Sequence, residues 1–175
     1  MVEERAGSNS RKRQRGFTLI ELVMVLAAMA ILALMAIPTM QEGTLRKQVK
    51  EGLALADVAK AGVQAAWSLA GEMPADNKAA GLPEPEKIVG TMVSAVRVDN
   101  GAVTLTFGNN ASKVLAGKKI TVRPAVVPDQ LIVPIAWLCH GANVPKGMEV
   151  RGRDETDLTA QTLPVECRET SAPAK

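Results

Sequence analysis

The feature that most constrains this chain is a long apolar stretch near its N-terminus. Between Phe17 and Ile37 every residue is apolar or small except Thr18 and Glu21. A run of about twenty such residues is what an α-helix needs to cross a bilayer core of about 30 Å. The basic cluster RKRQR comes directly before it, and Lys and Arg on one flank hold that end in the cytoplasm. The pattern therefore predicts a membrane-inserted helix with a cytoplasmic N-terminus.

Glu21 is unusual inside such a helix, because a carboxylate there costs about 2.5–3.5 kcal/mol on insertion scales and needs a partner or a purpose. A cut between Gly16 and Phe17 would give Phe17 a free α-amine one turn before Glu21. The carboxylate would then neutralise such an amine, most usefully that of a neighbouring subunit, and it would lie near the positive end of the helix dipole. We therefore expect Glu21 to guide the side-by-side packing of many copies of this helix.

The segment RGFTLIE, which ends at Glu21, resembles the type III signal of type IV prepilins. The resemblance implies that a prepilin peptidase cuts after Gly16, that the new N-terminal Phe17 is methylated, and that Glu21 serves assembly. Pro38 matches the proline near the end of the family's apolar segment and implies a helix kink. The tyrosines that usually follow that proline are absent, since the chain contains no Tyr. This departure concerns packing detail in a filament.

Two other interpretations of the stretch stay open. Ala28 and Ala30 form an A-x-A site typical of an ordinary secretory signal. A carboxylate early in the apolar core is unfavourable for such a signal, and the apolar run continues well past this site. The second alternative is a plain membrane anchor in which Glu21 is incidental. In that case nothing would compensate the cost of inserting its carboxylate into the membrane.

The net charge of the chain is concentrated in the segment before the expected cut. The formal net charge is +3, and residues 1–16 alone carry five basic and two acidic side chains. The remainder is therefore balanced, so the processed protein has no overall basic charge for non-specific binding of phosphate. Nucleic acid stays possible as a partner of a local patch but is unsupported by the charge of the mature chain.

A second helical section is predicted from about Gln41 to Ala70. Apolar residues recur there at three- and four-residue spacing and give the segment one apolar face: Leu45, Val49, Leu53, Ala56, Ala59, Val63, Ala66 and Trp67. Gly71 is expected to end the helix, and the turn-rich residues 73–87 are expected to form an exposed loop.

The following segment is typical of an antiparallel sheet. Residues 93–98 and 103–107 flank Asp99-Asn100-Gly101, a strong hairpin signal. Residues 118–127 predict a third strand, and residues 131–138 a fourth, interrupted at Pro134. The fold class is therefore α+β: a long N-terminal helix, with a transmembrane and an amphipathic half, packed on about four antiparallel strands.

Two cysteines, Cys139 and Cys167, lie in the part expected outside the cytoplasm. An even count in an oxidising compartment favours a disulfide, and two buried free thiols are the alternative. The motifs IAWLC and LPVEC around them fall in the order found in a-type type IV pilins, which this region is similar to. The resemblance implies that the C-terminal loop they close is the surface-exposed, often receptor-facing region of such pilins.

No catalytic or metal-binding constellation is recognised, and no cofactor is expected. His140 is the only histidine, so a catalytic triad would have to use it beside Cys139. A P-loop-like run has Ser112 where the first Gly is required and Lys119 where Ser or Thr is required. The acidic residues Asp154, Glu155 and Asp157 lack the spacing of a known calcium loop, so a solvated surface is the preferred interpretation over a calcium site.

These features predict a leader at residues 1–16, a membrane and filament-core helix at 17–40, and a globular region at 41–175. The function implied by the resemblance is a structural subunit of a type IV pilus, made as a single-pass inner-membrane protein and assembled by inner-membrane machinery into an extracellular homo-oligomeric filament. Such filaments serve twitching motility, adhesion and DNA uptake. The alternatives are a type II secretion pseudopilin, a minor tip pilin that binds DNA or a host surface, and a membrane-anchored periplasmic enzyme.

Overall fold

The computed structural model describes residues 17–168, and for residues 35–40 it describes the backbone alone. The chain divides into two compact units, Met1–Thr39 and Met40–Lys175. One long helix, α1 (Leu19–Ala70), begins in the first unit and ends in the second. Gly16 and the rest of the expected leader lie outside the described residues.

The end of α1 follows the sequence expectation. Gly71 has a positive φ of 71°, a conformation that glycine adopts without steric cost. Its N–H donates to the carbonyl of Trp67 at 2.9 Å and satisfies one of the last carbonyls of the helix. The prediction that the helix stops at this glycine is confirmed.

The second unit contains an antiparallel sheet in the order β1 (Val93–Asp99), β2 (Ala102–Phe107), β3 (Lys119–Val126) and β4 (Ala136–Cys139). A two-residue strand, β5 (Glu149–Val150), also pairs with β3. Because Ala125 pairs with both Ala136 and Val150, β5 lies on the side of β3 opposite β4. Two short 3₁₀ helices complete the unit, η1 (Pro85–Lys87) and η2 (Val165–Cys167).

The fourth strand is displaced from its predicted position. Residues 131–135 form no strand, and β4 begins only at Ala136, after Pro134. Proline has no N–H for a ladder hydrogen bond, which explains why pairing with β3 starts beyond it. The prediction of a strand over residues 131–138 is therefore wrong in its first half, and β5 was not predicted.

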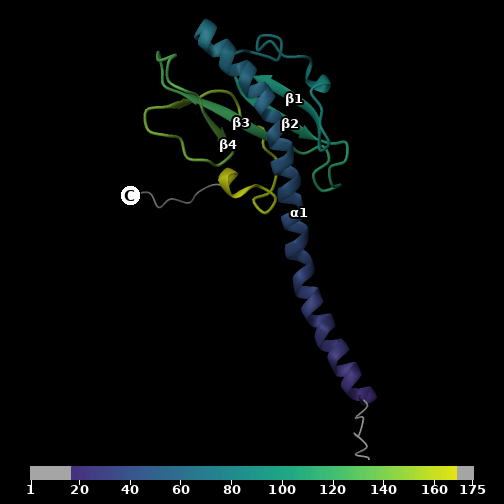
Figure 1. The fold of residues 1–175 in the computed structure, drawn as a ribbon. Helices are drawn as coiled ribbons and strands as arrows, with labels where there is room; N and C mark the ends of the chain where they lie inside the picture. The colour runs from purple at the N-terminus through teal and green to yellow at the C-terminus, as the bar shows by residue number, and fades with distance from the viewer. Residues whose placement is uncertain (1–16, 169–175) are drawn as a thin grey trace, which may run out of the picture. The chain divides into compact units, whose positions relative to one another are not determined.

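The core lies between the second half of α1 and one face of the sheet (Figure 1). The residues of α1 that are fully buried are those that the apolar spacing selects, among them Val49, Ala56 and Ala59. They share this core with inward-facing strand residues, including Leu105 and Phe107. The prediction of an amphipathic helix on an antiparallel sheet is confirmed.

Glycines allow α1 to approach its neighbours closely. A Cβ added to Gly52 would lie 2.7 Å from the Phe107 ring, and one added to Gly62 would lie 2.6 Å from the carbonyl oxygen of Ala80. By contrast, nothing lies within 4 Å of such an atom at Gly43. Gly52 and Gly62 therefore serve packing, although each lowers helix propensity by about 1 kcal/mol relative to Ala.

The residues between α1 and β1 are held against the sheet edge through Asn77, which is buried. Its Nδ2 donates to the carbonyls of Val96 and Pro83, at 3.0 and 2.9 Å, and its Oδ1 accepts from the N–H of Val98 at 2.6 Å. The amide side chain thus takes the place of a neighbouring strand along part of β1. This satisfies backbone groups that an edge strand otherwise leaves unpaired.

Candidate functional site

The N-terminal end of α1 is capped by the prepilin-like motif itself. Thr18 precedes the first helical residue, and its Oγ1 accepts the backbone N–H of Glu21 at 3.3 Å. Thr18 and Glu21 have the T-x-x-E spacing of a capping box, a sequence signal for the start of a helix that the predictions above do not include. Phe17 lies just outside the helix and is 83% exposed.

The Glu21 side chain is exposed, and within residues 17–168 its carboxylate has no ion pair and no hydrogen-bond donor. The first turn of α1 provides only the partial positive charge of the helix dipole, and Glu21 is the one acidic residue in that turn.

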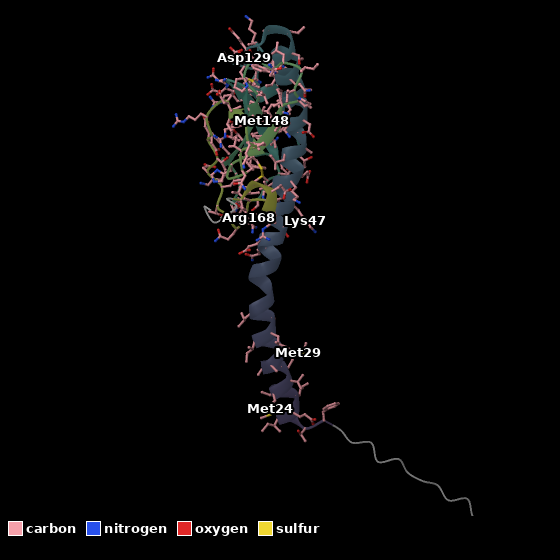
Figure 2. All side chains as sticks on the ribbon, turned by 90° about the vertical axis from the view of Figure 1, so that its left-hand side faces the viewer. Met24, Met29, Lys47, Asp129, Met148 and Arg168 are labelled. Atoms are coloured by element: carbon pink, nitrogen blue, oxygen red, sulfur yellow. A yellow bond between two sulfur atoms is a disulfide. The ribbon has the colours of Figure 1, made fainter. Side chains whose placement is uncertain are left out.

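Apolar side chains cover the first turns of α1. Leu19 and Leu34 are both exposed, and Met24 and Met29 project outward from the helix (Figure 2). Over the described part of the chain, none of the helices has the length and apolar character needed to cross a membrane. The segment for which a membrane span is expected includes residues 35–40, whose side chains lie outside that description.

The backbone of α1 is continuous through position 38. The side chain of Pro38 lies outside the described residues, and the kink expected there stays a prediction.

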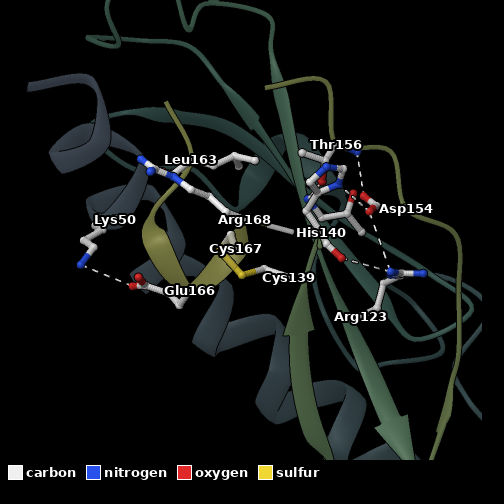
Figure 3. Close-up of a disulfide and its surroundings, with 11 residues drawn as sticks. Lys50, Arg123, Cys139, His140, Asp154, Thr156, Leu163, Glu166, Cys167 and Arg168 are labelled. Carbon is white, nitrogen blue, oxygen red and sulfur yellow. Dashed lines mark hydrogen bonds and ion pairs between the residues drawn. A yellow bond between two sulfur atoms is a disulfide. The ribbon is translucent and has the colours of Figure 1, made fainter. Parts of the chain in front are cut away.

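The second predicted site is the disulfide, and the structure contains it. Cys139 at the end of β4 is joined to Cys167 at the end of η2 (Figure 3). The N–H of Gly141 also donates to the carbonyl of Cys167 at 3.4 Å. Glu166, next to the disulfide, forms an ion pair with Lys50 of α1 at 3.4 Å. The bridge therefore fixes both ends of a C-terminal loop beside the helix.

The C-terminal loop comprises residues 140–166, and its residues 152–156 lie on the face of the sheet that points away from α1. Thr104 and Thr121 on that face are buried, and their hydroxyl groups hydrogen-bond to each other at 2.9 Å. Gly152 passes so close to Ala102 that a side chain at Gly152 would collide with the Ala102 methyl group. This part of the loop therefore forms a second layer on the sheet, whereas residues 143–147 are exposed.

The acidic residues of this loop anchor it. The Glu155 carboxylate accepts hydrogen bonds from Arg97 of β1 and Lys119 of β3, at 2.5 and 3.2 Å, and these bonds lower the pKa of Glu155. Asp157 accepts the backbone N–H of Lys119 at 2.6 Å. Asp154 lies beside them, and the described residues contain no cluster suited to a metal ion. Arg123 of β3 also lies 3.9 Å from Asp154, so all three carboxylates contact the sheet, while Asp157 remains exposed to solvent.

His140 also belongs to this anchoring network. Its Nδ1 lies 2.9 Å from Oδ2 of Asp154, and its backbone carbonyl accepts from Arg123 at 3.4 Å (Figure 3). Partial burial raises the pKa of Asp154, but hydrogen bonds from Thr156 and His140 outweigh this effect, so the pKa is lowered. The pair joins Asp154 of the C-terminal loop to the residue that directly follows β4 and Cys139. No serine hydroxyl is hydrogen-bonded to His140 within the described residues, so a catalytic triad is not assembled there.

Comparison with known proteins identifies both ends of the chain. Residues 46–168 match the family model described as pilin, a bacterial filament protein, and residues 11–37 match the prokaryotic N-terminal methylation motif.

Individual relatives agree with these matches. A type IV major pilin protein PilE1 of Neisseria gonorrhoeae is 33% identical over 91% of this chain and 89% of its own length. A fimbrial protein of Neisseria meningitidis is 41% identical over 62% of this chain and 65% of its own length. The fimbrial protein EcpC of Eikenella corrodens is 31% identical over 91% of this chain and 94% of its own length.

Proposed function

The chain belongs to the pilin family of bacterial filament proteins, and from this we propose that it matures at Phe17 and polymerises through the first half of α1. As a member of the family it is a structural subunit of a type IV pilus, not an enzyme, and it ends up in the extracellular pilus. The observation that carries the proposal is the methylation motif at residues 11–37, joined by one helix to a pilin region.

Processing is the first step of the proposed mechanism. Prepilin peptidase cuts between Gly16 and Phe17 and the new α-amine is methylated. Since α1 begins at Leu19, the cut leaves the helix and its Thr18 cap intact. It also removes the net positive charge of residues 1–16, which holds that end in the cytoplasm before processing.

Assembly is the second step. The Glu21 carboxylate has no partner among the described residues of its own chain, and it lies one turn from the new N-terminus. In the proposal it pairs with the Phe17 amine of a neighbouring copy. An unpaired carboxylate is costly in an apolar environment, so this pair favours one axial stagger between adjacent helices over others. The apolar side chains around it are then covered by other copies.

Each segment of the chain has its own role in these two steps. Residues 1–16 are the leader, residues 17–40 lie in the inner membrane and then in the filament core, and residues 41–175 form the globular region. Pro38 allows a kink near the end of the apolar segment. The inner-membrane assembly machinery is the partner that acts when the chain passes from the inner membrane into the filament.

The use of the filament is proposed at the level of the family: twitching motility, adhesion or DNA uptake. The named relatives are major pilins and fimbrial proteins, which does not favour the alternatives of a secretion pseudopilin or a minor tip pilin. The disulfide-closed loop is the expected outward-facing part, while the balanced charge of the mature chain gives no support for non-specific DNA binding.

Mass spectrometry of protein sheared from the cell surface tests the proposal. We expect the dominant species to begin at N-methylated Phe17. A dominant species that begins near Ile31 would instead indicate an ordinary secretory signal and would contradict polymerisation through α1. A methylated Phe17 found only in trace amounts would contradict the role of a major subunit.

A further inference from the structure

One end of the globular region carries an exposed apolar knob, Leu131 and Ile132, in the connection between β3 and β4. Ile132 is 90% exposed and Leu131 is 44% exposed. The Leu131 side chain lies beside Gly71, 3.7 Å from the position of an added Cβ, so the knob is at the C-terminal end of α1. Two adjacent large apolar side chains held out in this way favour coverage by another surface.

The other end of the globular region carries an apolar groove. It has a volume of about 330 Å³ and lies between α1 and the connection from β2 to β3, and it is lined by Gln41, Thr44, Leu45, Ser112 and Val114. The N–H of Ser112 donates to Oε1 of Gln48 at 3.0 Å and fixes this connection to the helix. Val114 is 61% exposed on one wall of the groove. The groove is thus preformed and partly apolar.

The knob and the groove of one chain cannot meet. Leu45 of α1 is 26 residues before Gly71, which directly follows the last residue of α1, and this separation is about 39 Å at 1.5 Å per residue. Figure 2 shows Asp129, beside the knob, and Lys47, beside the groove, at opposite ends of the globular region. A contact between these two surfaces therefore requires two copies of the chain.

The two ends also carry opposite charge. Asp129 and Glu72 line a hollow together with Leu131 at the knob end, and Arg151 in that hollow is already paired with Glu149 at 2.8 Å. Lys47 and Lys113 are exposed next to the groove-lining residues. Within residues 17–168, no ion pair is formed by the two carboxylates, Asp129 and Glu72, or by the two lysines, Lys47 and Lys113. Their charges are available to a complementary surface.

We propose that the knob of one copy docks in the groove of another, with Asp129 and Glu72 facing Lys47 and Lys113. The proposal rests on the role of the chain as a pilus subunit. Two different surfaces meet in this contact, so it is heterologous, and a heterologous contact that does not close into a ring produces an open helical filament. Copies joined in this way are offset by about 39 Å along α1. The contact adds a link between globular regions to the packing of the N-terminal helices.

A charge swap tests the electrostatic part of the contact. Asp129→Lys and Lys113→Glu should each reduce the amount of sheared pili at least about threefold, because each places like charges opposite one another. The double variant should return the yield to within about twofold of wild type. The matched control is Glu86→Lys, since Glu86 is exposed, lines neither the hollow at the knob nor the groove, and should tolerate reversal. Single variants with wild-type yield, or a double variant without rescue, would overturn the proposal.

A cross-link tests the apolar part and does not depend on yield. Sheared pili of an Ile132→Cys, Val114→Cys double variant should give a ladder of covalent multimers without reductant, whereas neither single variant should. Peptide mapping checks that Cys139 remains bonded to Cys167. Abundant pili of the double variant without a ladder would overturn the docking proposal alone. Absence of the wild-type chain from sheared filaments would instead overturn its role as a pilus subunit.

Discussion

The two halves of α1 have the same secondary structure but different sources of stability. In the second half, Val49, Ala56 and Ala59 are completely buried by the chain's own sheet. In the first half, residues 19–34 expose their apolar side chains and only the cap at Thr18 adds a local interaction. Burying a large apolar side chain contributes about 1.5–3 kcal/mol, so the first half depends on surfaces outside the chain for this contribution.

The comparison separates two kinds of substitution. Changes in the first half of α1 should alter assembly and leave the stability of the globular region unchanged. Changes in the globular region should alter that stability first. Trp67 and Trp137 both lie in the globular region, so tryptophan fluorescence of the full chain in detergent reports its unfolding selectively.

The largest effect is expected at Glu21. Glu21→Lys places a cation where the proposal requires an anion, so surface pili should fall at least about tenfold, the equivalent of about 1.4 kcal/mol for each contact. Leader removal and fluorescence-detected melting should stay as in wild type. The control is Glu51→Lys, an exposed carboxylate of the second half. Wild-type numbers of pili in the Glu21→Lys strain would contradict the assembly role.

The next largest effect is expected at the disulfide. Cys139 and Cys167 are 28 residues apart in the sequence, and closing a loop of this size stabilises by about 3–4 kcal/mol in the chain-entropy model. Replacing both with Ser should therefore lower the melting temperature by roughly 10 °C. Reduction of the wild-type protein should produce the same shift. An unchanged melting temperature would show that the ion pairs of the loop suffice without the bridge.

Asn77→Ala should cost about 2–3 kcal/mol in the free energy of unfolding. The substitution leaves the N–H of Val98 and the carbonyl of Val96 at the buried edge of β1 without their partner. Denaturant titration of the full chain in detergent measures the loss. The control is Asn143→Ala in the C-terminal loop, where no such hydrogen bonds are made. Equal stability of the two variants would show that the edge of β1 does not depend on Asn77.

Gly62→Ala should destabilise by about 1–2 kcal/mol, although Ala is normally the better helix former. The new methyl group would come within 2.6 Å of the Ala80 carbonyl, and relieving the overlap requires a backbone shift. Gly43→Ala is the matched control, because that position is open and alanine should stabilise the helix there by up to about 1 kcal/mol. If both substitutions changed the free energy of unfolding in the same direction, the packing role of Gly62 would be contradicted.

The smallest effect is expected at Glu155, and it depends on pH. Hydrogen bonds from Arg97 and Lys119 lower its pKa in the folded state, so its contribution is present above the unfolded pKa of about 4.5 and is lost as the pH falls through the lower folded value. Glu155→Gln should therefore cost up to about 1 kcal/mol at pH 7, and the cost should become steadily smaller as the pH falls below about 4.5. Melting curves of both proteins across that range measure the difference. If the difference in stability between the two proteins did not change with pH, the effect of Glu155→Gln would come from packing and not from the charge of Glu155.

The sequence predicted the parts of this fold that local patterns determine. The apolar spacing identified the buried face of α1, the Asp99-Asn100-Gly101 turn placed the β1–β2 hairpin, and the even cysteine count led to the disulfide. Each of these signals depends on neighbouring residues or on compartment chemistry. The segments at Arg15 to Glu21 identified the family because few other functions require that pattern.

Long-range contacts explain what the sequence did not show. Glu155 lies 58 residues from Arg97, so the spacing of the acidic residues in the sequence gives no sign that Glu155 binds the sheet. Asn77 was expected in an exposed loop because its neighbours are turn formers, yet it pairs with β1. β5 is only two residues long and has no periodicity to detect. The contacts of Glu155 and Asn77 and the pairing of β5 all depend on residues that are distant in the sequence.

In the proposed assembly, other copies of the chain cover the first half of α1. The most direct measurement is the distance between the Glu21 carboxylate and the nearest Phe17 α-amine in assembled filaments, determined at side-chain resolution by electron cryo-microscopy. We predict an ion pair between neighbouring copies, with nitrogen and oxygen within about 4 Å. Assembly through Glu21 would be wrong if its carboxylate faced solvent or lay more than about a Debye length of 8 Å from every such amine.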